Sequence, residues 1–299
     1  MKYIPVILKT LWKQSLGLLA ASLLCGFAIW GISGKASPLP MLAVSAGVWL
    51  VVILILYGYV ASKMKYEEPF FRIMRECGPC EEALKMHRHL YPNPSPPYRI
   101  ARADLLIAMD RFSEAEAELL SIPQPLQTTA PMRLRYHNCR MCIYAYTLRR
   151  QDAWQYYQAC CADADTAALR LPDLASSYYN TASLVLAMAG DAYSSERYCQ
   201  RLEQFAQKKK DTEKVLRIMI HAAVTRTERL YALGDVANAA ALEAQARTAI
   251  ENFTGFEHNW QKGFMLHLLD RAKTYVYSPA QNPNMIPQYP NSQYPNTGV

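Results

Sequence analysis

The sequence of 299 residues lacks the signatures of the common enzyme classes. It contains neither of the glycine-rich phosphate loops GxxxxGK[ST] and GxGxxG, no GxSxG nucleophile turn and no HExxH zinc pair. Its six histidines are scattered along the chain, and its eight cysteines form none of the short Cys-rich knuckles that usually hold zinc. We therefore predict a protein that is not an enzyme and that has no cofactor and no metal site.

Acidic residues are missing from residues 1–61, which carry Lys2, Lys9, Lys13 and Lys35. The whole chain has 32 Lys+Arg and 25 Asp+Glu, a net charge of +7, and without these four lysines the other 238 residues have 28 against 25, or +3. The positive excess therefore lies mainly beside apolar segments. Because nucleic-acid-binding domains concentrate positive charge on a protein face, we exclude nucleic acid as a partner and predict a membrane instead.

Two long uncharged stretches support this prediction. Between Lys13 and Lys35 lie 21 residues without charge, and between Lys35 and Lys63 lie 27 more. A helix needs about 20 apolar residues to cross the hydrocarbon layer, because each residue advances about 1.5 Å. We predict transmembrane helices at about 14–33 and 41–61, which form a membrane hairpin.

Lysines and arginines flank the outer ends of both spans, whereas the turn between them carries only Lys35. Positive residues favour the cytoplasmic side, so we predict a multi-pass protein of the cell membrane with a cytoplasmic N-terminus and a cytoplasmic C-terminal domain. A cleaved signal peptide is the alternative for the first span. A second alternative is that residues 14–61 form core helices of a soluble protein, which would need a partner surface.

Residues 62–277 have helical periodicity and almost no alternating β-branched runs, which predicts an all-α domain. Its clearest unit is the segment 103–120, which resembles the second half of helix A, the turn and the first half of helix B of a tetratricopeptide repeat. That family has four recurring positions: a small residue in helix A, a turn residue, an aromatic residue and a small residue in helix B. Here the resemblance assigns these roles to Ala103, Asp110, Phe112 and Ala115.

The same template fits less closely elsewhere, with Gly78, Gly190 and Gly234 as turn residues. In the third unit, the template assigns the small helix A position to Ala145, the turn to Asp152 and the aromatic position to Trp154. The equivalent helix B positions are then Ala83, Ala115, Tyr157, Ser195 and Ala239. We predict an α-solenoid of about five tetratricopeptide-like hairpins, closed by a helix near 257–277 that covers the last apolar face. A generic array of α-hairpins outside this family is the alternative.

The segment 278–299 contains five prolines, no charge and two copies of Gln-Tyr-Pro-Asn, at 288–291 and 293–296. With so little apolar surface to bury, we predict a disordered tail. It would serve either as a docking peptide or only as a solvated end.

The string Cys77-Gly78-Pro79-Cys80 looks like the redox dithiol of the thioredoxin family. That dithiol follows a β-strand, whereas the residues before Cys77 read as a helix, and Gly78 fits the repeat as a turn glycine. A membrane-tethered thiol-disulfide oxidoreductase, or a thiol switch, that uses Cys77 and Cys80 is therefore the alternative function.

The tetratricopeptide resemblance implies that helix A of each unit lines a concave groove that binds peptides. Projecting that register onto this sequence gives the candidate partner-binding residues Arg72, Arg75, Tyr146, Arg149, Arg150 and Asn180. Arg149 and Arg150, together with Tyr146, would suit a carboxylate, because guanidinium groups bind carboxylates bidentately. We predict a membrane-anchored scaffold that binds a protein or peptide partner. A structural subunit of a larger membrane complex is a further alternative, and the sequence leaves the oligomeric state undefined.

Overall fold

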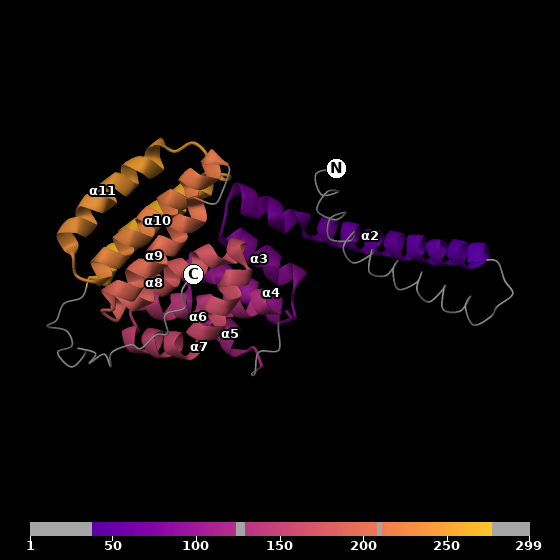
Figure 1. Ribbon diagram of the computed structural model, residues 1–299, viewed down its shortest axis with the longest axis horizontal. Helices are drawn as coiled ribbons and strands as arrows, with labels where there is room; N and C mark the ends of the chain where they lie inside the picture. Colours follow the sequence, from indigo (N-terminus) through magenta and orange to yellow (C-terminus); the bar gives the residue numbers. More distant parts are fainter. Residues whose placement is uncertain (1–37, 124–128, 208–210, 277–299) are drawn as a thin grey trace. The chain divides into compact units, whose positions relative to one another are not determined.

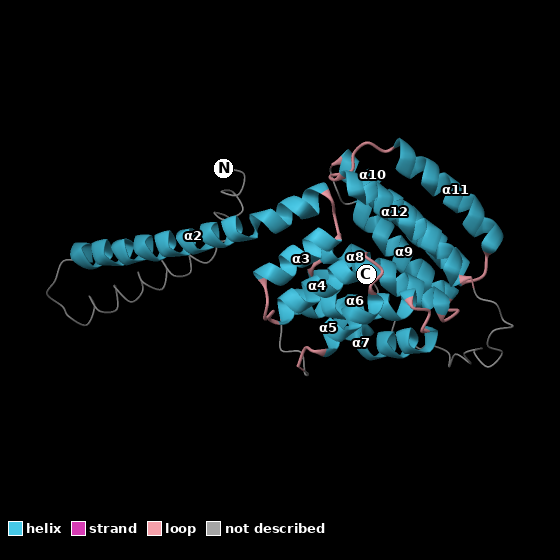
Figure 2. Ribbon diagram, turned by 180° about the vertical axis from the view of Figure 1, so that it is seen from behind, coloured by secondary structure: helices cyan, strands magenta, loops and turns pink. Residues whose placement is uncertain are grey.

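The computed structural model describes residues 38–123, 129–207 and 211–276. Within these ranges every regular element is a helix, which confirms the all-α prediction (Figures 1 and 2). The described elements are α2 (Pro38–Glu76), α3 (Glu81–Leu90), α4 (Pro96–Ala108), α5 (Phe112–Leu120), α6 (Ala130–Tyr146), α7 (Arg150–Arg170), α8 (Pro172–Met188), α9 (Ala192–Gln207), α10 (Thr212–Ala232), α11 (Val236–Asn252), α12 (Asn259–Ala272) and the 3₁₀ helix η1 (Lys273–Tyr275).

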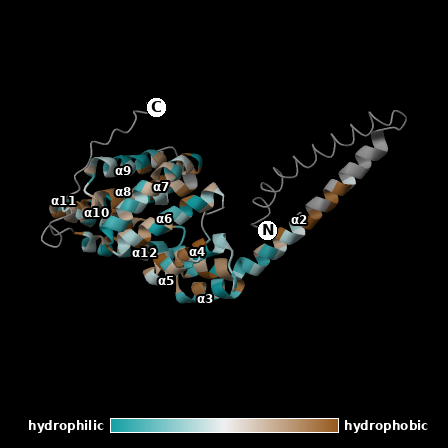
Figure 3. Ribbon diagram, turned by 90° about the horizontal axis from the view of Figure 1, so that it is seen from below, coloured by the Kyte–Doolittle hydropathy of each residue, from teal (hydrophilic) through white to brown (hydrophobic). Residues whose placement is uncertain are grey.

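The chain divides into two compact units, Met1–Arg72 and Ile73–Val299, which we describe separately. In the first unit, the predicted span 14–33 lies outside the described residues, and the predicted span 41–61 falls within α2. Within the described residues, no helix combines the length and the apolar character that a bilayer crossing requires. The α2 ribbon changes from apolar to polar toward its C-terminal end (Figure 3).

The second unit is built from consecutive helical hairpins. The pairs α4/α5, α6/α7, α8/α9 and α10/α11 pack against each other in chain order, with α3 before them and α12 after them. The first helix of each pair contacts the first helix of the next, so that α4, α6, α8, α10 and α12 form an inner row. This repeat-like arrangement is consistent with the predicted solenoid.

The turns between paired helices repeat the same hydrogen bond. After α4, α6, α8 and α10, the residue that directly follows a left-handed residue donates its backbone N–H to the carbonyl five residues earlier. The distances are 2.8–2.9 Å, and the pairs are Arg111 to Leu106, Arg149 to Tyr144, Asp191 to Leu186 and Asp235 to Leu230. This bond defines the Schellman helix end. The left-handed residues are Asp110, Leu148, Gly190 and Gly234, with φ from 56° to 86°.

The third unit differs from the sequence prediction by one helical turn. We expected Asp152 in the turn and Tyr157 at the small position of the second helix, but Asp152 lies in the first turn of α7 and Leu148 makes the turn. Five residues after each left-handed residue lies a fully buried small side chain, and here it is Ala153 rather than Tyr157. The sequence carries no signal for this displacement, because a leucine rarely adopts a left-handed conformation, which costs about 1–2 kcal/mol.

The last helix covers the end of the array, as expected of the helix near 257–277. Leu268 and Leu269 of α12 pack on Ile220 and Val224 of α10 and on Ile250 of α11. The C-terminal part of α12 also reaches the turn after α4, although 161 residues separate the two. Covering the terminal apolar face is what a solenoid needs to remain soluble.

Candidate functional site

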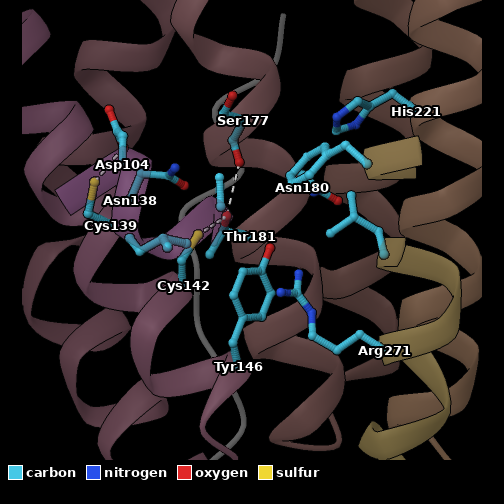
Figure 4. Close-up of a pocket in the computed structure, with 14 residues that line it drawn as sticks. Asp104, Asn138, Cys139, Cys142, Tyr146, Ser177, Asn180, Thr181, His221 and Arg271 are labelled. Carbon is cyan, nitrogen blue, oxygen red and sulfur yellow. Dashed lines mark hydrogen bonds between the residues drawn. The ribbon is translucent and has the colours of Figure 1, made fainter. Parts of the chain in front are cut away.

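A polar cavity of about 160 Å³ opens where the five inner helices of the second unit meet (Figure 4). Four of the five helices contribute several residues, mostly spaced three or four positions apart, which places them on one helical face. The lining residues are Asp104, Ile107 and Ala108 of α4, Asn138, Cys139, Cys142 and Tyr146 of α6, Ser177, Asn180 and Thr181 of α8, His221 of α10, and Phe264, Leu268 and Arg271 of α12. The cavity is therefore a product of the whole array.

Three buried polar atoms of this lining make no hydrogen bond to any described residue. They are Oδ1 of Asn138, Nδ1 of His221 and Nη2 of Arg271, and they come from three different helices. A buried polar atom without a partner costs about 1–3 kcal/mol, so native proteins contain few of them. Their concentration around one cavity indicates a place where water or a ligand completes the hydrogen bonding.

Arg271 is the best-anchored of these side chains, and only 10% of it is exposed. Its Nε donates to Tyr275 Oη at 2.9 Å, and its Nη1 lies 3.0 Å from Asp110 Oδ1. The guanidinium carbon also lies 3.5 Å from the centre of the Tyr146 ring, within cation–π distance. Burial lowers the pKa of Arg271, but the neighbouring Tyr146, Tyr275 and Glu228 outweigh it and raise that pKa. Arg271 is therefore a fixed positive charge.

The turn after α4 contains Asp110 and no glycine, because the aspartate side chain contacts α12. Asp110 is left-handed, at φ 56°, a conformation that favours glycine, yet its carboxylate binds two residues of α12. His267 Nε2 lies 2.7 Å from Oδ2, and Arg271 binds Oδ1. These contacts hold the C-terminal end of α12 beside the α4/α5 hairpin and close the inner row of helices around the cavity.

Several other polar groups of the wall are bonded to the protein. Thr225 donates to Asn180 Oδ1, and the Thr181 hydroxyl donates to the Ser177 carbonyl at 3.1 Å. Asp104 is paired with Arg135 and accepts a bond from Cys139 Sγ at 2.7 Å. The charges of the wall are thus balanced in pairs, Asp104 with Arg135 and Asp110 with Arg271.

Burial holds three ionisable side chains of the wall neutral, those of His221, Cys139 and Cys142. Burial lowers the pKa of His221, raises the pKa of Cys142 to about 11 and raises that of Cys139 well above its ordinary value. At neutral pH the imidazole is uncharged and both thiols keep their protons. A thiolate is needed for nucleophilic or redox chemistry, so the arrangement of this wall suits binding by hydrogen bonds.

A second, mainly apolar cavity of about 250 Å³ shares His221 and Phe264 with the first. Its wall contains Ser176, Leu202, Arg217, Ile218, Phe256, Trp260, Gln261 and Met265 as well. The buried Trp260 Nε1 makes no hydrogen bond to any described residue. The two cavities therefore lie on either side of His221 and Phe264.

Of the six predicted partner-binding residues, the structure brings Tyr146 and Asn180 together in the wall of the polar cavity. Arg149 and Arg150 lie at the start of α7, not on α6 as projected, because α6 ends at Tyr146. Arg149 Nη2 lies 2.8 Å from Glu116 Oε1, and Arg150 donates to the carbonyls of Met188 and Tyr275. Both guanidinium groups thus have internal partners.

The other two predicted residues, Arg72 and Arg75, both belong to α2. Arg72, the last residue of the first unit, and Arg75, in the last turn of α2, are exposed. Neither contributes to the lining of the two cavities. Their roles in binding remain predictions.

The Cys77–Cys80 loop lies between α2 and α3. Cys77 is exposed, Cys80 precedes the first residue of α3, and both are free thiols. Gly78 has φ +73°, which confirms it as a turn glycine, and a Cβ added there would come within 2.4 Å of Trp260 Cδ2. The redox alternative remains a prediction. Among the described residues, no group of three or more His, Cys, Asp or Glu could hold a metal ion.

Comparison with family models, curated proteins and solved structures finds no match. The candidate site therefore rests on the geometry of this chain alone. Sequence reasoning missed Asn138, Thr181, His221 and Arg271 as wall residues. Phe264, Leu268 and Arg271 have helical spacing in the predicted final helix, but nothing in the sequence shows which helices that face meets.

Proposed function

We propose that the protein is a membrane-anchored helical-repeat scaffold whose inner row of helices binds a protein or peptide partner. The observation that carries this proposal is the polar cavity, because five helices converge on it and three buried polar atoms there have no hydrogen-bond partner among the described residues. Its volume is below the roughly 300 Å³ of the smallest typical small-molecule pockets, so it fits a side chain better than a whole metabolite.

We further infer that the hairpins are tetratricopeptide-like. The repeated turn bond supports this, as does the close contact of small residues where paired helices cross. Ser183 of α8 and Ser195 of α9 are both fully buried and exchange hydrogen bonds between each side chain and the other's carbonyl, at 3.0 and 2.8 Å. Ala103 and Ala115 occupy the equivalent positions in the preceding α4/α5 pair.

The membrane part of the proposal is supported by α2 and by the sequence before it. Apolar side chains on α2 are 53–65% exposed: Val48, Leu50, Val51, Leu54 and Ile55. Such a patch is costly in water and favourable in lipid. Together with the absence of acidic residues in 1–61, this supports the hairpin at 14–33 and 41–61 and a cytoplasmic repeat domain.

Photo-crosslinking in intact cells tests the binding site. A photoreactive amino acid at Ser177, an exposed residue of the cavity wall, should give adducts with a partner. The control position is Tyr193 of α9, which is 75% exposed and outside both cavities. Equal adducts from the two positions would rule out the cavity as the binding site.

Thiol labelling of intact cells tests the membrane topology separately. In a Cys77→Ser background, single cysteines replace Ser37, in the predicted turn, or Ser278, in the predicted tail. A membrane-impermeant maleimide should label only the Ser37→Cys protein. Labelling of Ser278→Cys from outside would overturn the topology, and labelling of neither would argue against the hairpin.

A further inference from the structure

We propose that the two cavities bind the uncharged tail of this same chain, which carries two copies of Gln-Tyr-Pro-Asn, at 288–291 and 293–296. The amide of an Asn or Gln would enter the polar cavity and a tyrosine ring the apolar cavity. This inference rests on the proposed function, because the tail would occupy the site that we assign to a partner.

The polar cavity offers both a donor and an acceptor that have no partner in the described part of the chain. Arg271 Nη2 is a donor, and Asn138 Oδ1 is an acceptor as assigned. A side-chain amide presents both a carbonyl oxygen, which matches the donor, and an NH₂ group, which matches the acceptor. A carboxylate would satisfy only the donor, and an ammonium group only the acceptor.

Charge also favours a neutral occupant. The charges in or beside the polar wall are paired, Asp104 with Arg135 and Asp110 with Arg271. Glu228 is a further buried acidic group near Arg271, but it does not line the cavity and makes no hydrogen bond to any described residue. Burying an additional unpaired charge here would be costly. The segment 277–299 carries no charged side chain.

The apolar cavity suits an aromatic ring. Phe256, Trp260 and Phe264 are in its wall, and rings gain about 0.5–1.5 kcal/mol from edge-to-face or stacked contacts beyond their buried area. An apolar protein cavity of about 150 Å³ holds benzene, so about 250 Å³ has room for a phenol side chain. The unpartnered Trp260 Nε1 can donate to the tyrosine hydroxyl.

The described chain ends beside the site. Tyr275 is fully buried and bonded to Arg271 of the polar wall, and the next residue, Val276, is the last one described. Tyr289 is 13 residues further on (289 − 276), a tether that can span about 40 Å when extended. A segment tethered at this distance has an effective concentration near millimolar, so even weak docking would compete with a partner.

Crosslinking within the full chain tests where the tail binds. A photoreactive phenylalanine derivative at Tyr289 or Tyr294 should give intrachain adducts with residues of the two cavities. Ala108→Leu and Ser176→Leu, which add volume to the walls of the polar and apolar cavities, should reduce these adducts at least about fivefold. Ala240→Leu, on an exposed position of α11, should leave them unchanged. Adducts elsewhere in the chain would refute the proposal. Adducts that Ala108→Leu and Ser176→Leu do not reduce would refute it as well.

A peptide of residues 288–296 provides a second measurement. It should bind in trans to full-length protein in which Gln288, Tyr289, Asn291, Gln293, Tyr294 and Asn296 are all replaced by Ser. Binding to the unmodified protein should be at least about tenfold weaker, because the tethered tail competes. Equal binding to both proteins, or binding to neither, would refute the tail as occupant.

These outcomes are separable from those of the proposed function. A partner that crosslinks at Ser177 while the tail gives no cavity adduct would leave the scaffold standing and remove only this inference. Tail adducts with a different protein would show that the tail docks onto a partner, and would likewise overturn its place in the cavities.

Discussion

Glu228 of α10 is fully buried, and neither of its carboxyl oxygens bonds to any described residue. Burial raises the pKa of this carboxyl to about 7, from an ordinary value of 4.5, and the charge of Arg271 opposes only part of that rise. The folded state therefore holds a proton that the unfolded chain releases at lower pH. The stabilisation is full below about pH 4.5 and is lost as the pH rises through 7.

The magnitude follows from the two pKa values. Raising the pKa from 4.5 to about 7 corresponds to about 3 kcal/mol, most of which is lost between pH 5 and pH 8. Glu228→Gln cannot ionise, so the free energy of unfolding of this variant, relative to wild type, should improve by roughly 2–3 kcal/mol between pH 5 and pH 8. Comparing the two pH values cancels the effect of the amide itself.

Urea unfolding of the full chain, followed by helical circular dichroism at both pH values, measures this difference. Glu243→Gln is the matched control. Burial raises the pKa of Glu243, but hydrogen bonds from Lys273, Tyr231 and Arg247 outweigh it and lower that pKa. Glu243 stays ionised throughout the range, so its replacement should destabilise about equally at pH 5 and pH 8. If Glu228→Gln also behaves identically at the two pH values, the carboxyl is not a buried, unpaired acid.

Three further predictions concern turns and thiols. Gly78→Ala should destabilise by about 2 kcal/mol or more in urea unfolding, because φ is +73° and the new Cβ would collide with Trp260; unchanged stability would contradict that packing. Asp110→Ala should cost more than Asp110→Asn, since alanine loses both the contacts with α12 and the side chain that tolerates a left-handed conformation. Equal losses would mean that the turn conformation contributes nothing. In native protein, iodoacetamide should modify the exposed Cys77 and should leave the buried Cys139 and Cys142 unmodified until urea is added. Rapid native labelling of Cys139, read by mass spectrometry, would show that the wall of the polar cavity opens.

The sequence determined the fold class because helical periodicity is a local property. Glycines and small residues also predicted the turns of most hairpins, since Gly190 and Gly234 supply the left-handed conformation that the Schellman turn requires. The third hairpin was misplaced by one turn because Leu148 supplies that conformation at an energetic cost and carries no such signal. Tyr146 and Asn180 were found because they lie on the inner face of their helices, and that face follows from the repeat register.

Only the tertiary structure decided how the site is assembled. Arg271 reaches Asp110 across 161 residues, and no local pattern predicts such a contact. Likewise, the sequence predicts that Arg149 and Arg150 bind a partner's carboxylate, but the bend after α6 turns them toward Glu116 and toward the carbonyls of Met188 and Tyr275. The sequence thus determines which residues share a helical face, because that depends on 3.6 residues per turn. The packing of α12 against the array determines which faces meet, because it depends on side chains far apart in the chain.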